Sequence, residues 1–119
     1  MQSYSDLIVW QRAVQLDTAI YKLTEKFPKS ELFGLVSQMR RAAVSIPSNI
    51  AEGYARKHWA EYIQFIRTAY GSGAELETQL HLSRNLGFAS EKDTAEARAL
   101  LDETMRMLNK FISSLASKD

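Results

Sequence analysis

The feature that most constrains this fold is an apolar stripe that recurs in four segments, with steps of three and four residues. In the first segment the stripe consists of Val9, Ala13, Leu16, Ile20, Leu23 and Phe27. Such steps average 3.5 residues, the spacing that keeps one side of a helix facing its neighbours in a bundle. Only 5 glycines and 2 prolines interrupt the 119 residues, so long helices are favoured over frequent turns. We therefore predict an all-α chain.

Capping and helix-breaking residues divide these stripes into four helices. Ser5 or Asp6 can cap the first helix, and Pro28 disfavours helical structure at the residue before it. The four helices are expected over residues 5–27, 30–52, 59–86 and 91–115. Gly87 suits the left-handed position after the third helix, and Ser90 can cap the fourth. Because short connections force each helix back along its predecessor, we predict an antiparallel up-and-down four-helix bundle, a single domain over residues 1–119.

Pro47 lies inside the second predicted helix. A proline there removes one backbone hydrogen bond and collides with the carbonyl four residues earlier, at a cost of about 3 kcal/mol. We expect the second helix to be kinked at Pro47, or broken there.

Two glycines, Gly71 and Gly73, fall within the third predicted helix. Each costs about 1 kcal/mol relative to alanine in a helix, so close contact with another element is expected there. That element is either the second helix of the same chain or another subunit.

The absence of cysteine removes disulfides, thiolate zinc sites and cysteine nucleophiles from consideration. The first residues do not combine a basic leader with an apolar core, and no apolar run reaches the roughly 18 residues of a membrane span. We expect a cytoplasmic protein that has no membrane partner.

No arrangement of polar residues matches a catalytic or metal site. Glu77 and His81 are four residues apart on one helix, which is typical of a surface pair, and Glu75 and Glu77 point to different faces. No glycine-rich phosphate loop is present. We therefore expect no enzymatic activity, no metal and no cofactor; a ligand-binding enzyme would require a polar cavity, for example around Glu52 and Glu75.

The segment RRAAVSIPSNIAEG, residues 40–53, allows two interpretations. In the first, its small residues let another helix approach closely, and polar side chains form a structural network. The residues of that network are Ser45, Ser48, Asn49, Glu52 and Glu75. In the second, arginines and lysines of this region form a phosphate-binding patch for RNA or DNA. The candidate nucleic-acid-binding residues are Arg40, Arg41, Arg56, Lys57 and Arg67.

Charge is distributed unevenly although the net charge is only +1. Residues 38–58 contain four basic side chains and one acid, whereas residues 89–105 contain two basic side chains and five acids. We expect one basic face and one acidic face.

Several motifs resemble a known bacterial family. They are Trp10, Phe27-Pro28, Gly34-Leu35, Gln38, Arg40-Arg41-Ala42, the run SIPSNIAEG at residues 45–53, Gly71-Ser72 and Glu75-Leu76. Together they resemble the four-helix-bundle proteins first described from open reading frames inside intervening sequences of 23S ribosomal RNA genes, over residues 6–88. The resemblance implies an up-and-down bundle that assembles as a ring-like homopentamer and has no enzymatic activity.

A related subgroup, the accessory variability determinant proteins of diversity-generating retroelements, is similar in the same motifs. That similarity implies a basic pentamer that binds nucleic acid and a reverse transcriptase, with Arg40, Arg41, Arg56 and Lys57 as candidate contacts. The leading hypothesis is thus a non-enzymatic, homopentameric scaffold or adaptor for RNA, DNA or a nucleic-acid-processing protein. The alternative is an oligomer that binds only proteins, whose affinity would depend far less on salt.

Overall fold

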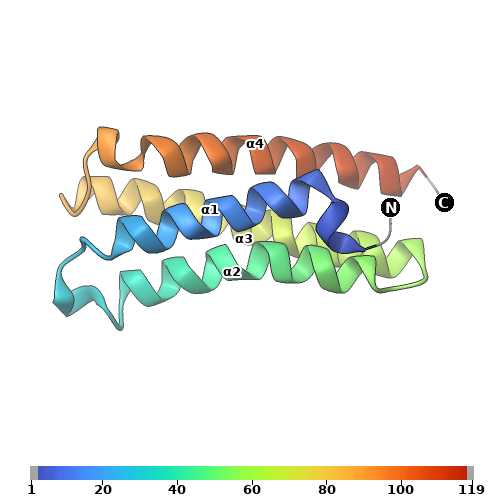
Figure 1. Ribbon diagram of the computed structural model, residues 1–119, viewed down its shortest axis with the longest axis horizontal. Coiled ribbons are helices and arrows are strands. Elements are labelled where there is room, and N and C mark those ends of the chain that lie inside the picture. The colour runs from blue at the N-terminus through green and yellow to red at the C-terminus, as the bar shows by residue number, and fades with distance from the viewer. Residues whose placement is uncertain (1–2, 118–119) are drawn as a thin grey trace.

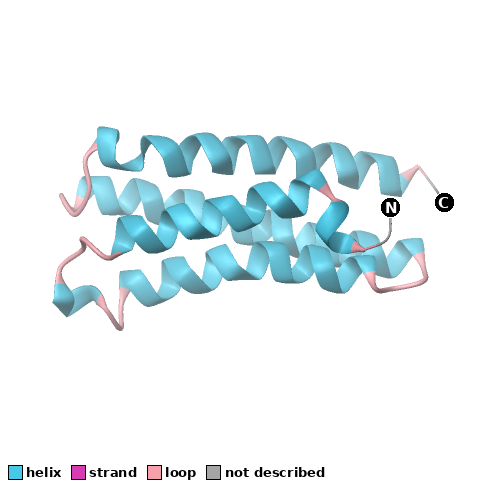
Figure 2. Ribbon diagram, in the orientation of Figure 1, coloured by secondary structure: helices cyan, strands magenta, loops and turns pink. Residues whose placement is uncertain are grey.

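The computed structural model describes residues 3–117, which form an elongated bundle of 46 × 22 × 21 Å. Helices account for most of these residues, and no strand occurs among them (Figure 2). The four main helices are α1 (Ile8–Thr24), α2 (Leu35–Tyr54), α3 (Trp59–Asn85) and α4 (Glu91–Ala116). They run alternately up and down (Figure 1), which confirms the predicted all-α four-helix bundle.

Each helix packs against two others, so the bundle is square in section. The contacts join α1 to α2, α2 to α3, α3 to α4, and α4 back to α1, and the most extensive of them is between α2 and α3. All six residues of the predicted first stripe are buried. The largest fully buried side chains of the core come from all four helices: Leu16, Ile20, Met39, Ile46, Ile50, Ile66, Leu76, Leu80 and Leu108.

The first two helices begin later than predicted, because short 3₁₀ turns precede them. Tyr4–Asp6 forms one such turn, in which Ser3 and Asp6 make a reciprocal capping box, so α1 begins only at Ile8. Lys29–Glu31 forms another, and Glu31 Oε1 accepts a hydrogen bond of 3.2 Å from the Leu35 N–H. The Glu31 side chain therefore caps the start of α2, whereas α1 begins after its 3₁₀ turn without a side-chain cap of its own.

The second helix continues through Pro47 without a break, so the predicted alternative of a broken helix is wrong. Pro47 is buried, and α2 packs against both α1 and α3 (Figure 1). Packing on both sides holds the chain helical on either side of the missing N–H.

The connection between α3 and α4 forms as predicted. Gly87 has a φ of +77°, and the Phe88 N–H donates to the Ser83 carbonyl at 2.9 Å, which closes the end of α3. Ser90 and Asp93 form a capping box with two bonds of 3.0 Å, and the Ser90 backbone N–H is the main cause of the lowered pKa of Asp93.

Candidate nucleic-acid interface

Arg40 faces α1 and is engaged in packing the bundle. Its Nε donates to Thr24 Oγ1 at 2.9 Å, and its NH2 donates to the Tyr21 carbonyl at 3.4 Å. Its guanidinium carbon lies 4.5 Å from the centre of the Tyr21 ring. These contacts hold α2 against α1, and they leave Arg40 little capacity to bind an external phosphate.

Arg56 is exposed but already has two partners. Its NH2 lies 3.6 Å from Glu52 Oε2, and its guanidinium carbon lies 4.7 Å from the centre of the Phe65 ring. Because the Glu52 pair is open to solvent, it is weak, and Arg56 keeps part of its capacity for phosphate.

Arg41, Lys57 and Arg67 are exposed, and none of them makes an ion pair within residues 3–117. Arg41 lies on α2, Lys57 on the connection to α3, and Arg67 on α3. At 1.5 Å per residue, Arg41 is about 20 Å along α2 from the end of that helix, so these cations are spread along the bundle rather than gathered in one compact patch. They are the candidate residues whose charge is available to a polyanion.

The polar network between α2 and α3 is smaller than the predicted one. The Ser45 and Ser72 hydroxyls lie 2.8 Å apart, and Asn49 Nδ2 donates to both the carbonyl and the hydroxyl of Ser45 at 2.8 and 2.9 Å. Two of the predicted members, Ser48 and Glu75, point to solvent. Of the predicted set, the structure therefore brings together Ser45 and Asn49, while Glu52 pairs with Arg56 instead.

The two glycines of α3, Gly71 and Gly73, have different surroundings. A Cβ on Gly73 would collide with the Met105 sulfur of α4, so the element that requires this glycine is α4 rather than α2. Gly71 is exposed, and a Cβ there would meet nothing within 4 Å. α2 and α3 approach closely at Gly53, where a Cβ would lie 2.8 Å from Phe65 Cβ.

Asp17 is a partly buried residue that was not among the predicted site residues. Its Oδ1 is inaccessible to solvent and has no hydrogen-bond partner among residues 3–117, and burial raises the pKa of Asp17 to about 8. The spacing in the sequence could have indicated this burial. Asp17 falls four residues after Ala13 and three before Ile20, at the edge of the buried stripe.

Exposed apolar side chains surround a shallow groove between α1 and α2, which we call the α1/α2 groove. Phe33 is 93% exposed and Leu32 is 49% exposed, although both are large apolar residues. Tyr21 and Val44 complete this apolar rim, and Arg41 lines the same groove. Together they make a mixed apolar and basic surface.

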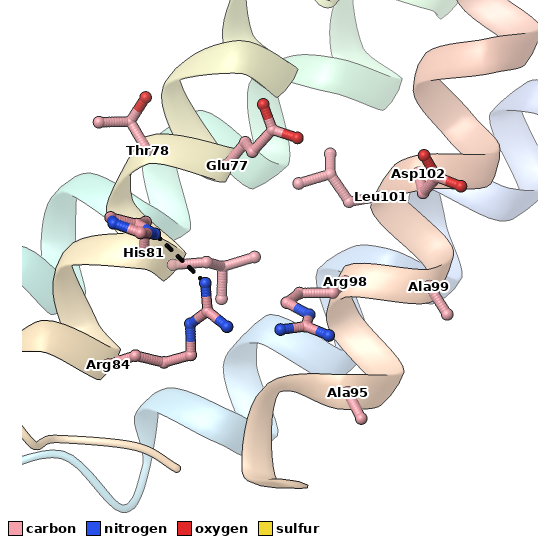
Figure 3. Close-up of a pocket in the computed structure, with 10 residues that line it drawn as sticks. Glu77, Thr78, His81, Arg84, Ala95, Arg98, Ala99, Leu101 and Asp102 are labelled. Atoms are coloured by element: carbon pink, nitrogen blue, oxygen red, sulfur yellow. Dashed lines mark hydrogen bonds between the residues drawn. The ribbon is translucent and has the colours of Figure 1, made fainter. Parts of the chain in front are cut away.

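A second groove, of about 750 Å³, runs between α3 and α4 and is called here the α3/α4 groove (Figure 3). It is lined by Glu77, Thr78, Leu80, His81 and Arg84 from α3 and by Ala95, Arg98, Ala99, Leu101 and Asp102 from α4.

A ligand-binding enzyme was expected to have a polar cavity around Glu52 and Glu75. Neither of these residues lines the α1/α2 groove or the α3/α4 groove. Within residues 3–117 no cluster of three potential metal ligands is present.

The profile of the 23S rRNA-intervening sequence proteins matches residues 5–110, which include α1, α2 and α3 entirely and most of α4. The chain belongs to the 23S rRNA-intervening sequence protein family. A search of curated proteins gave no match.

The family assignment agrees with the resemblance inferred from the motifs of residues 6–88 and extends it into α4. The run at residues 45–53 that carries much of the resemblance forms the second half of α2, where α2 packs on α3. In this 23S rRNA-intervening sequence protein, none of the helices described is both long and apolar enough for a membrane span.

Proposed function

We propose that this protein is a non-enzymatic, homopentameric adaptor that binds RNA or DNA through its exposed cations. The observation that carries the proposal is that Arg41, Lys57 and Arg67 are exposed and unpaired among the described residues. Sequence-independent affinity for nucleic acid arises from such cations, because each one that contacts a phosphate releases condensed counterions.

Self-association is the second part of the proposal. Phe33 and Leu32 expose large apolar surfaces at the α1/α2 groove, and contact with another copy would remove those surfaces from water. A pentamer would also present Lys57 and Arg67, which lie outside that groove, five times each, so weak contacts per chain would add to a useful avidity. This gain offsets the small net charge of the single chain, +1.

The proposed partner is a nucleic acid, alone or held by a nucleic-acid-processing protein. An adaptor of this kind would place several phosphate contacts around one assembly, and it would leave any chemistry to that protein. We expect its affinity to depend little on base sequence, because contacts to phosphate groups carry no sequence information directly.

The test is binding of a labelled structured RNA and of duplex DNA, measured by fluorescence anisotropy across a salt series. The variant R41A/K57A/R67A should weaken binding and reduce the salt slope by up to about 3, which is close to one for each lost phosphate contact. The matched control is K22A/R106A/K110A, which removes three exposed cations from α1 and α4. Equal losses in both proteins would contradict a role for the α2 and α3 cations.

A purely protein-binding oligomer is the second candidate, and the apolar rim of the α1/α2 groove favours it. Its signature is an intact oligomer that binds neither RNA nor DNA even at low salt. In that case F33A, which removes the most exposed apolar side chain, should weaken partner binding with little dependence on salt.

A further inference from the structure

Two arginines from different helices meet at one end of the α3/α4 groove. Arg84 belongs to the last turn of α3, and Arg98 lies two turns into α4. Their NH1 atoms lie 4.0 and 3.7 Å from the same oxygen of Glu91. The two NH1 atoms are therefore at most 7.7 Å apart, which is the sum of those distances, and Figure 3 shows both guanidinium groups turned into the groove.

This pair of charges is incompletely neutralised. The Glu91 side chain is 80% exposed, and both its distances exceed hydrogen-bond length. The Arg84 guanidinium makes one hydrogen bond in the described chain, from NH2 to His81 Nδ1 at 3.3 Å, and its buried Nε has no partner. By contrast, Arg12 on α1 makes a direct bond of 3.1 Å to Glu103.

The rest of the groove limits what can bind there. Its walls include apolar side chains from both helices, namely Leu80, Ala95, Ala99 and Leu101. Glu77 and Asp102 line the groove on the side away from Arg84 (Figure 3). An anion is attracted to the arginine end and repelled from the carboxylates, so its position in the groove is restricted.

We propose that the arginine end of the α3/α4 groove binds an isolated phosphate group, either inorganic or the terminal group of a phosphomonoester. A phosphate dianion has enough acceptor oxygens to bridge two guanidinium groups, whose N–H donors match tetrahedral oxyanions. Glu91 occupies this position loosely and would move aside when phosphate binds. The proposal is independent of the proposed nucleic-acid binding, since the groove contains none of Arg41, Lys57 or Arg67.

The direct test follows the arginine side-chain Nε–H signals by NMR while sodium phosphate replaces sodium chloride at constant ionic strength. Saturable shifts are expected for Arg84 and Arg98, whose signals are identified from the R84K and R98K variants. Arg106, which is exposed on α4 and pairs with Asp102 at 3.2 Å, serves as the internal control. Shifts of the same small, non-saturating size at all three arginines would overturn the proposal.

Variants of Arg84, Arg98 and Glu91 distinguish an effect on phosphate binding from an effect on folding. R84Q and R98Q should each weaken phosphate binding by about tenfold or more, because each removes one side of a charge-assisted bridge. E91Q should strengthen phosphate binding several-fold by removing the competing carboxylate, whereas E96Q, another exposed carboxylate on α4, should leave the affinity unchanged. Because E91Q tests for a gain, it remains informative if R84Q does not fold, and an unchanged affinity in E91Q would contradict the bridging position.

A parallel titration with glycerol phosphate distinguishes the two sources of the phosphate group. Tighter binding of glycerol phosphate than of inorganic phosphate would identify a phosphomonoester that also contacts the apolar walls, and equal affinity would identify free phosphate. Binding of an oligonucleotide that lacks a terminal phosphate, with no saturable effect of either small phosphate on Arg84 and Arg98, would contradict a site for an isolated phosphate.

Discussion

The hydroxyl of Ser45 on α2 lies 2.8 Å from the hydroxyl of Ser72 on α3, and Asn49 Nδ2 donates to the same Ser45 oxygen. Substitution S72A removes one of these bonds, and S45A removes both side-chain bonds of Ser45. At about 1 kcal/mol for each hydrogen bond, S45A should destabilise the fold more than S72A in urea unfolding. S48A, at an exposed neighbouring serine, should change the free energy of unfolding by less than about 0.5 kcal/mol.

The three helix-internal glycines should respond to alanine in different directions. G71A should raise the free energy of unfolding by up to about 1 kcal/mol, because the site is open and alanine favours helix. G73A should lower it by about 1–3 kcal/mol through overpacking against Met105. G53A should be the most damaging, because its Cβ would lie 3.3 Å from the Tyr62 carbonyl oxygen, and backbone yields less readily than a methionine side chain.

A double-mutant cycle checks the glycine assignment. The variant G73A/M105A should be more stable than the sum of the single effects implies, because the shorter side chain at position 105 leaves room for the new Cβ. If the changes in free energy of unfolding were strictly additive, contact with Met105 would not be the reason that position 73 requires glycine.

Asp17 should make stability fall as the pH rises. Its pKa is raised from 3.8 to about 8 by burial, so the folded state retains a proton that the unfolded state loses. The contribution of this raised pKa to the free energy of unfolding is therefore complete below about pH 4. It decreases as the pH rises and is lost by about pH 8, with a slope of at most about 1.4 kcal/mol per pH unit. Urea unfolding of D17N from pH 4 to 8 should lack this slope, and an unchanged slope in D17N would contradict a raised pKa for Asp17.

Arg40 and Arg41 are adjacent in sequence but should behave differently. R40A should destabilise the fold by about 1–2 kcal/mol, because it removes the bond to Thr24 and the contact with the Tyr21 ring. R41A should change stability by less than about 0.5 kcal/mol, because Arg41 is exposed and unpaired among the described residues. The stabilities of R40A and R41A can be compared by thermal unfolding. If the two variants were equally stable, Arg40 would not be a packing residue.

The features of the fold that depend on periodicity could be predicted from the sequence. The first stripe, from Val9 to Phe27, is buried as its spacing indicated, and the Gly87 turn and the Ser90 cap form where predicted. Helix starts were less predictable because they depend on local capping, such as the bond from the Leu35 N–H to Glu31.

The site was less predictable than the fold. Which of Arg40 and Arg41 faces α1 depends on the rotation of α2, about 100° per residue, and the sequence left both orientations open. The proximity of Arg84 and Arg98 depends on the register between α3 and α4, which no spacing along one helix can reveal.

The central claim, a homopentamer that binds nucleic acid through exposed cations, is tested most directly by sedimentation velocity with a labelled RNA. Five chains should sediment with the RNA as one complex at low salt, and the RNA should be released at high salt with the pentamer intact. A different chain number, or RNA that sediments alone at low salt beside an intact assembly, would contradict the claim.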